Sequence, residues 1–176
     1  MSEAPDMTCG SPDPILEVWA GSFRPQESAS PELPPHHHLC LGCGPENPHG
    51  HHLRAQRCEH GVCAHHIFDQ RHVGAPGIAH GGAVATVIDD LFGFLLYTVG
   101  ELAVTRHLEI DYLAPILLDT PYALHAVVRS REGRKLDLGA RIEDVAGRSV
   151  ATATALFIVV DVEHFIRSQA KTQDRR

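Results

Sequence analysis

The chain has 176 residues, which is long enough for one domain with a substantial core. Hydrophobic residues make up 43% of it, and 22 acids against 15 lysines and arginines give a net charge of −7. This acidic balance argues against a nucleic-acid-binding protein, which would present a basic face. Because the chain also holds 14 histidines, part of its charge titrates near neutral pH.

The first 38 residues are rich in Pro, Ser and Glu, so we expect residues 1–38 to form a flexible N-terminal arm. Only the stretch from Ile15 to Phe23 is apolar enough to dock, as one short helix or as an extended arm. The start of the chain lacks the basic and apolar regions of a signal peptide, and we therefore expect a cytoplasmic protein with reduced cysteines. One domain is predicted over residues 39–163, followed by a flexible tail at 164–176.

Two cysteine pairs raise the question of a metal site. Cys40 and Cys43 lie in a loop rich in Gly and Pro, and their spacing is that of a zinc half-site. Cys58 and Cys63 have the wrong spacing to complete a zinc knuckle, and fit two residues that face each other across a β-hairpin formed by residues 53–58 and 62–68. We therefore expect no metal. A disulfide between Cys58 and Cys63 is geometrically compatible with the hairpin but is not expected in the cytoplasm.

The stretch 78–99 is predicted to contain one long helix, about 27 Å long and buried on most sides, because apolar residues recur at helical spacing along it. The segment is nearly long enough to span a membrane. Two acids at its centre, Asp89 and Asp90, would cost about 2.5–3.5 kcal/mol each there, so no membrane span is expected. A second face of the helix carries small residues except for Asp89, and a carboxylate in such a place is usually kept for a partner or for chemistry.

The C-terminal half alternates apolar and polar residues and predicts four strands, at about 108–112, 123–129, 136–142 and 150–160. In the last strand Ala151, Ala153 and Ala155 line one face, which allows close approach by the long helix. The order is two strands, one helix and four strands. It predicts an α+β fold in which an antiparallel sheet wraps around one buried helix.

Several motifs together resemble the hot-dog-fold acyl-CoA thioesterases. They are GAPGIAHGG and HGGAVATVIDDLFG at the helix entry, then TRHLEIDYLAP, EGRK and ATATALFI, and the likeness covers about residues 40–162. The branch most similar is the phenylacetyl-CoA-thioesterase-like (PaaI-like) one, which includes the long-chain members of the superfamily. The resemblance implies a sheet of five to six strands around one central helix, and a homodimer or a dimer of dimers (homotetramer) with active sites between protomers.

The resemblance also implies a reaction in fatty acid metabolism: hydrolysis of an acyl-CoA to a free acid and coenzyme A, which enters only as part of the substrate. Gly81 and Gly82 begin the helix, so their N–H groups and the positive end of the helix suit an oxyanion; a tight turn is the other explanation for two glycines. Asp89 matches the catalytic carboxylate, as general base or as nucleophile, and burial should raise its pKa. Asp90 lies one position further round the helix, and we assign it a structural role.

Three further positions match the family pattern. His80 corresponds to the histidine before the glycines, which either positions the thioester or locks the loop. Thr105 matches a threonine that lies near the catalytic acid in the long-chain branch, where it is supplied across the dimer. Strand parity puts Thr105 on the face opposite Leu108, so it needs a bulge or a strand start to reach the helix. Arg134 and Lys135 lie in a turn that suits the phosphates of coenzyme A, although an ordinary solvated turn has the same composition.

Two alternatives to a thioesterase share this fold. An enoyl-CoA hydratase carries a motif resembling Gly-Asp-x-Asn-Pro-x-His; the segment Gly44–His49 has Pro45 in place of the aspartate and precedes the first strand, which argues against that activity. A non-catalytic acyl-CoA-binding protein remains an alternative, because one fold hosts many functions.

Overall fold

The computed structural model describes residues 14–23 and 30–163. Six strands form one antiparallel sheet in the order β1-β2-β6-β7-β8-β5. Their bounds are β1 Ala55–Cys58, β2 Gly61–Ile67, β5 Ala103–Tyr112, β6 Pro121–Glu132, β7 Lys135–Glu143 and β8 Ser149–Val159. The predicted tail 164–176, and all of the predicted arm before Pro14, lie outside the described residues.

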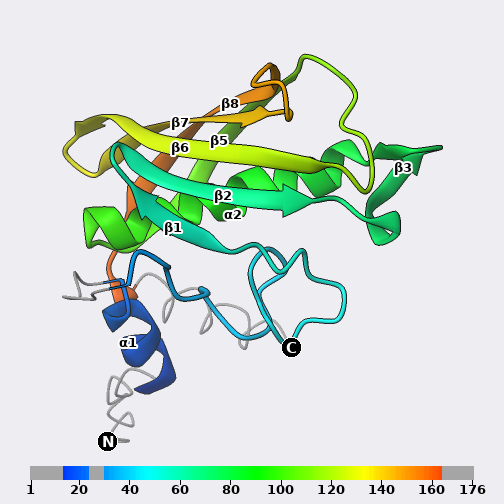
Figure 1. The fold of residues 1–176 in the computed structure, drawn as a ribbon. Coiled ribbons are helices and arrows are strands. Elements are labelled where there is room, and N and C mark those ends of the chain that lie inside the picture. The colour runs from blue at the N-terminus through cyan, green and yellow to red at the C-terminus, as the bar shows by residue number, and fades with distance from the viewer. Residues whose placement is uncertain (1–13, 24–29, 164–176) are drawn as a thin grey trace, which may run out of the picture.

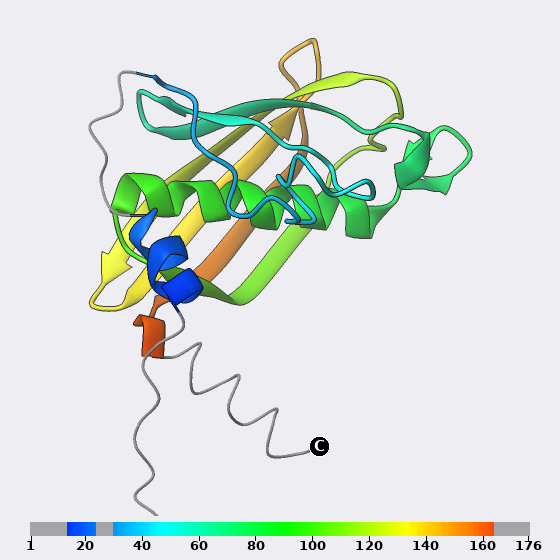
Figure 2. The same ribbon diagram turned by 90° about the horizontal axis from the view of Figure 1, so that it is seen from below.

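The long helix α2, Gly81–Val99, crosses the strands of this sheet, as Figures 1 and 2 show. The apolar positions that predicted it are buried, among them Val84, Ile88, Leu91 and Leu95. The helix is long and apolar enough to cross a membrane by length and composition, but its buried residues form the centre of the domain core. The predicted α+β architecture is confirmed, and the fold is a hot-dog fold.

The helix begins three residues later than its apolar run. Ile78–Ala79 instead form a short strand, β4, that pairs with β3, Val73–Ala75, after a single 3-10 turn at Gln70–His72. His80 has extended backbone angles, φ −66° and ψ 133°, and caps the helix at its start. The segment between residues 70 and 79, predicted as loop, is therefore a small two-stranded sheet.

The alanine face of β8 is buried, as predicted. Ala151, Ala153 and Ala155 are each no more than 5% exposed. Phe157 lies on the same face of the strand, and its ring contacts that of Phe92 on α2 with centroids 6.1 Å apart. The small side chains thus let the sheet lie close to the helix, and Phe92 and Phe157 form an aromatic contact between the two.

The described part of the N-terminal region packs on the domain. The predicted short helix is α1, Pro14–Gly21, and Phe23 after it is buried against Tyr97 of α2, with ring centroids 4.8 Å apart. Residues 30–38, which the sequence assigned to the arm, also lie on the domain: Leu33 is buried and its N–H donates to the carbonyl of Ala55 in β1. Figure 2 shows α1 and the segment after residue 30 beside α2.

Candidate active site

The start of α2 holds three of the predicted site residues at the surface. The Nδ1 atom of His80 accepts a hydrogen bond of 2.9 Å from the N–H of Gly82. This bond requires an unprotonated Nδ1, so neutral His80 carries its proton on Nε2. The N–H of Gly81 has no acceptor within the described part of the chain, and the Tyr112 hydroxyl donates to the Gly81 carbonyl at 2.7 Å. Of the two predicted oxyanion donors, Gly81 is therefore open and Gly82 is engaged by His80.

The middle of α2 brings Asp89 to Thr105. The Thr105 hydroxyl donates to Oδ1 of Asp89 at 2.8 Å. Strand parity required a bulge for this contact, and the pairing of β5 with β8 shifts register between Thr105 and His107. The extra residue, Arg106, turns Thr105 to the same face as Leu108. The contact forms within one chain, whereas the resemblance placed the threonine across a dimer.

Asp89 is a half-buried acid with a perturbed pKa. Burial raises the pKa of its carboxyl, and this effect outweighs the hydrogen bond from Thr105 and the charge of His36, which act in the opposite direction. The carboxyl lies at a cavity of about 280 Å³ between α1, α2, β5 and β8. The cavity is lined mainly by apolar side chains, including Trp19, Phe23, Leu96, Leu102, Val104 and Phe157.

A second hollow, of about 470 Å³, lies at the other end of β5. It borders Gly81 and Tyr112, and its remaining walls are Val84 of α2 and apolar residues from β4 and from the segment 113–116. β5 therefore connects two hollows, one beside Asp89 and one beside the open amide of Gly81. Tyr112 also belongs to this site. It lies in the motif TRHLEIDYLAP, but the sequence predicted no role for it.

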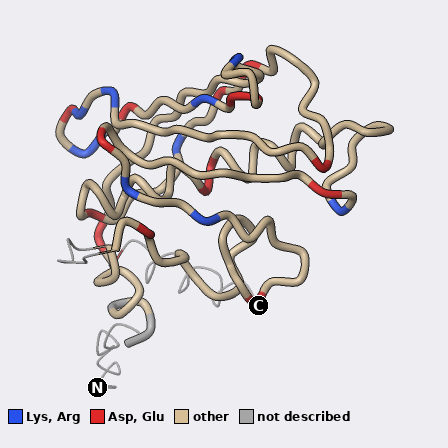
Figure 3. Tube along the Cα trace, viewed as in Figure 1, with Lys and Arg blue, Asp and Glu red and all other residues tan. Residues whose placement is uncertain are grey.

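Arg134 and Lys135 are exposed in the turn between β6 and β7, where Figure 3 shows basic residues gathered at one end of the sheet. Lys135 pairs with Ile158 of β8, and Ile158 pairs with Val104 of β5. Because neighbouring strands lie about 4.8 Å apart, about 10 Å separates the backbones of Lys135 and Val104, the neighbour of Thr105. The basic turn thus lies at the end of the sheet where Thr105 contacts Asp89.

The structure separates the two cysteine pairs. Cys58 and Cys63 lie on the two strands of the predicted hairpin, β1 and β2, but they do not face each other directly: Cys63 pairs with Gln56, and Cys58 pairs with Gly61. Cys40 and Cys43 lie instead with His36 and Asp90, and we call these four residues, His36, Cys40, Cys43 and Asp90, the His–Cys–Asp cluster. The structural role predicted for Asp90 matches this placement, but no sequence signal linked it to His36, 54 positions earlier.

The chain resembles known thioesterases in sequence over its central part. The family model "Thioesterase superfamily" matches residues 76–151. The acyl-coenzyme A thioesterase THEM4 of Rattus norvegicus is 39% identical over 89 residues, which are 50% of this chain and 38% of that protein. THEM4 of Xenopus laevis is 38% identical over 87 residues, 48% of this chain and 39% of that one. The chain therefore matches about two-fifths of the length of these relatives.

Solved structures with the same fold also come from this superfamily. The thioesterase superfamily protein RHA08564 superposes with a TM-score of 0.63 at 25% identity, covering 69% of this chain and 60% of its own. A hypothetical thioesterase from Streptococcus pneumoniae, solved with coenzyme A, gives 0.58 at 23% identity, with 61% and 85% covered. The PaaI protein of E. coli gives 0.55 at 18% identity, with 59% and 80% covered. These last two likenesses show the hot-dog fold alone.

Proposed function

We propose that this hot-dog-fold chain, which resembles the thioesterase superfamily over residues 76–151, is an acyl-CoA thioesterase with Asp89 as its reacting carboxylate. The observation that carries the proposal is the hydrogen bond from Thr105 to Asp89 at an apolar cavity, made through a bulge in β5. A bulge that re-aims one polar side chain at one half-buried acid is a feature expected next to an active site. In an S. pneumoniae neighbour of the same fold, alanine variants have been solved at an aspartate and a threonine 16 positions apart, the separation of Asp89 and Thr105.

The reaction needs an attacking group and an oxyanion donor on one carbonyl. Asp89 takes a proton from water, whose oxygen bonds to the thioester carbon; alternatively its carboxylate attacks that carbon directly and water then hydrolyses the anhydride. The N–H of Gly81 and the Nε2–H of His80 are donors for the oxyanion that develops. When the C–S bond breaks, the sulfur of coenzyme A takes up the proton, and both routes yield a free acid and coenzyme A.

Asp89 and Gly81 of the same chain are too far apart to act on the same thioester carbonyl. They are eight residues apart on α2, which is about 12 Å along the helix axis. β5 lies at an edge of the sheet and runs alongside α2 in the opposite direction. Thr105, near the start of β5, contacts Asp89, and Tyr112, at the end of β5, contacts Gly81. Antiparallel pairing of β5 with the β5 of a second copy would therefore bring Asp89 of one chain to Gly81 of the other. We propose that the enzyme is a homodimer joined along β5, with two such sites.

Arg134 and Lys135 would bind the phosphates of coenzyme A, because they lie about 10 Å from the start of β5, at the end of the sheet where Thr105 contacts Asp89. Coenzyme A is present in the S. pneumoniae neighbour and acetyl CoA in the neighbour from Streptococcus mutans. The cavity beside Asp89 and the basic turn equally support the second candidate function, which is acyl-CoA binding without catalysis.

Release of free thiol from a chain-length series of acyl-CoAs separates these two functions. We expect turnover by the wild type and a loss of about 100-fold or more in Asp89→Asn, the usual size for a missing general base. Glu59→Gln, at an exposed position in the β1–β2 turn, is the matched control for loss of one carboxylate and should keep full turnover. Saturable acyl-CoA binding without thiol release by any of the three proteins would instead leave a binding protein.

A mixed dimer tests the two-chain site. Gly81→Pro removes the amide hydrogen at the first helical position, where proline is tolerated, and His80 before it is already extended as a residue preceding proline must be. Asp89→Asn and Gly81→Pro should each be inactive alone. Co-expressed with different tags and purified as a mixed dimer, they should recover up to about half of the wild-type rate, because one site keeps both groups. No recovery in a dimer that is verified to be mixed would refute the shared site.

A further inference from the structure

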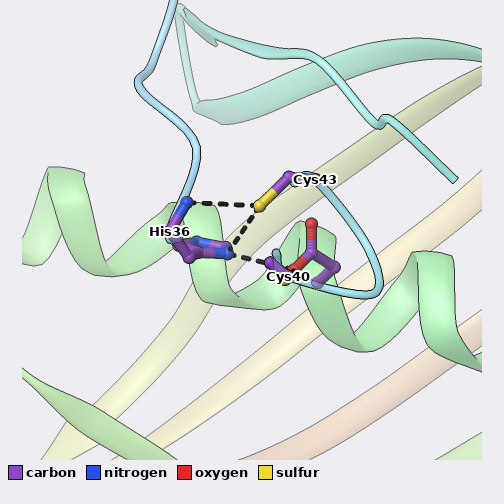
Figure 4. Close-up of side chains that lie close together, drawn as sticks. His36, Cys40 and Cys43 are labelled. Atoms are coloured by element: carbon purple, nitrogen blue, oxygen red, sulfur yellow. Dashed lines mark hydrogen bonds and ion pairs between the residues drawn. The ribbon is translucent and has the colours of Figure 1, made fainter. Parts of the chain in front are cut away.

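The His–Cys–Asp cluster collects four metal-binding side chains at one point of the fold. His36 comes from the segment before the Gly/Pro-rich loop, Cys40 and Cys43 come from the loop itself, and Asp90 comes from the middle of α2. One ligand atom from each residue lies within 4.8 Å of the other three. Figure 4 shows the side chains of His36, Cys40 and Cys43 turned toward one another above the helix. We propose that this cluster is a zinc site, one that fastens the N-terminal segment to α2.

The distances between the ligand atoms suit a small tetrahedral ion. His36 Nδ1 lies 3.0 Å from Asp90 Oδ1 and 3.2 Å from Cys43 Sγ, and Cys40 Sγ lies 3.2 Å from Asp90 Oδ1. Zinc bonds of about 2.0 Å to nitrogen or oxygen and about 2.3 Å to sulfur give tetrahedral edges of about 3.3–3.8 Å. These three distances are thus within a few tenths of an ångström of tetrahedral edges, and the other three are no longer than 4.8 Å.

The ligand types select zinc among the common metals. Two sulfurs, one imidazole nitrogen and one carboxylate oxygen form a tetrahedral set, whereas calcium and magnesium prefer oxygen ligands in larger numbers. Because all four positions come from the protein, the site is closed, as in structural rather than catalytic zinc sites. The backbone N–H of His36 also donates to Cys43 Sγ at 3.2 Å, an arrangement that stabilises a thiolate ligand.

Two glycines allow the loop and the helix to approach closely enough. A Cβ atom at Gly42 would lie 2.1 Å from Cγ of Asp90, and a Cβ atom at Gly93 would lie 2.7 Å from Cε1 of His36. One glycine lies on each side of the contact, so any larger residue at either position would push two of the ligands apart. The backbone on both sides is thus shaped around the cluster.

The cluster is also enclosed. The side chains of His36 and Asp90 are 12% and 8% exposed, and the His36 ring packs on Phe94 with centroids 4.4 Å apart. The second oxygen of Asp90 is buried and has no hydrogen-bond partner in the described part of the chain. Cys43 is buried and Cys40 half-buried beside this carboxylate, and two thiolates with one carboxylate carry more negative charge than an imidazolium of His36 alone can compensate, whereas a divalent ion can.

Zinc at this position would hold the wall of the cavity beside Asp89. Trp19 of α1 donates from its indole N–H to the carbonyl of His36 at 2.8 Å, so the ligand segment carries α1 with it. Trp19 and Phe23 line the cavity that contains Asp89. The zinc site does not depend on the proposed thioesterase activity, since its ion can be measured without any substrate.

Metal analysis of the purified 176-residue chain tests the site directly. We expect about one zinc ion per chain, lost in Cys40→Ser/Cys43→Ser. The control variant Cys9→Ser/Cys58→Ser/Cys63→Ser replaces the other three of the five cysteines and should keep its zinc. Zinc retained in the first variant, or lost only in the second, would overturn the assignment.

Cobalt substitution of the wild-type chain covers the case in which the double variant fails to fold. Cobalt in a two-thiolate site should give sulfur-to-metal charge-transfer absorption, and Asp90→Asn should weaken cobalt binding at least about 100-fold. A wild-type chain that contains no zinc and also gives no cobalt–thiolate absorption would refute the proposal. Cobalt bound with unchanged affinity in Asp90→Asn would remove Asp90 from the ligand set and refute the four-ligand site.

Discussion

Three buried histidines should make the domain sensitive to mild acid. His51, His66 and His72 are 8%, 7% and 7% exposed and pack together beside Phe68. The rings of His51 and His72 stack with centroids 4.0 Å apart, and that of His66 lies 5.5 Å from His51. One ring nitrogen of each histidine is buried without a hydrogen-bond partner among the described residues. Protonation of any of the three in place would bury a charge.

The environment lowers all three pKa values. Burial is the largest cause, and the charge of a neighbouring histidine adds to it: the pKa of His51 falls to about 4 and that of His66 to about 3. The pKa of His72 is also lowered, mainly by burial. The charged groups that act on the three are Asp69, which raises their pKa values, and Arg71, which lowers them, with His52 adding a smaller lowering effect on His51.

The sign of the pH effect follows from these directions. Below about pH 6.5, His51 and His66 become protonated in the unfolded chain. In the folded chain His51 stays neutral until about pH 4 and His66 until about pH 3. Stability from the neutral histidines is therefore complete above about pH 6.5 and is lost as the pH falls from there toward 3. At about pH 5, each of these two histidines costs about 2 kcal/mol, so we expect a loss of about 4 kcal/mol relative to about pH 7.

Urea unfolding at about pH 7 and about pH 5 measures this loss. His66→Gln removes one buried titrating group and should reduce the pH-dependent loss by about 2 kcal/mol, whatever its effect on stability at neutral pH. His65→Gln is the matched control, since His65 is the exposed neighbour on β2, and it should keep the full loss. The same pH-dependent loss in both variants would refute the assignment of acid sensitivity to this cluster.

Three further substitutions have direct structural expectations. Phe92→Ala should lower the free energy of unfolding by about 3–5 kcal/mol in chemical denaturation, because the ring is fully buried between α2 and the sheet; a loss below about 1 kcal/mol would contradict the packing. Gly42→Ala should lower the melting temperature, since its Cβ atom would lie 2.1 Å from Cγ of Asp90, and an unchanged melting temperature would show that the loop moves freely. Thr105→Val should lower kcat for thiol release about 10-fold or more, while Thr105→Ser, which keeps the hydroxyl that donates to Asp89, should retain most of it; equal rates in the two variants would remove the hydroxyl from the reaction.

The elements that local pattern defines could be read from the sequence. The helix and the strands follow from hydrophobic period, which depends on near neighbours only, and the structure confirms all six strands of the main sheet. The bulge before His107 could also be predicted from the sequence. In a regular strand Thr105 and Leu108 point to opposite faces, yet both had to face the helix. The start of α2 at Gly81 agrees with the prediction, but the small sheet before it was missed, because Ile78 and Ala79 follow a Gly- and Pro-rich stretch that indicates loop.

The contacts between distant segments could not be read from the sequence. His36 and Asp90 are 54 positions apart. The segment before His36 is held to β1 by hydrogen bonds of Pro31 and Leu33, and the loop after it is closed by hydrogen bonds within itself, so no periodic pattern marks its path. The spacing of Cys40 and Cys43 suggested a half-site, but Cys58 and Cys63 had the wrong spacing to complete it, and no metal was expected. Only the fold shows that a histidine and an aspartate complete the set of four.

The neighbouring acids Asp89 and Asp90 allow the two proposals to be separated on one helix turn. Successive residues of a helix point about 100° apart, and here Asp89 meets Thr105 on β5 while Asp90 meets His36 and the cysteine loop. Asp89→Asn should therefore abolish thiol release and leave zinc content unchanged. Asp90→Asn should lower the zinc content directly. It should affect turnover only by displacing the wall of the cavity, so KM should rise while part of kcat is retained. An Asp90→Asn variant that loses turnover but keeps its full zinc content would assign the catalytic role to Asp90 instead of Asp89.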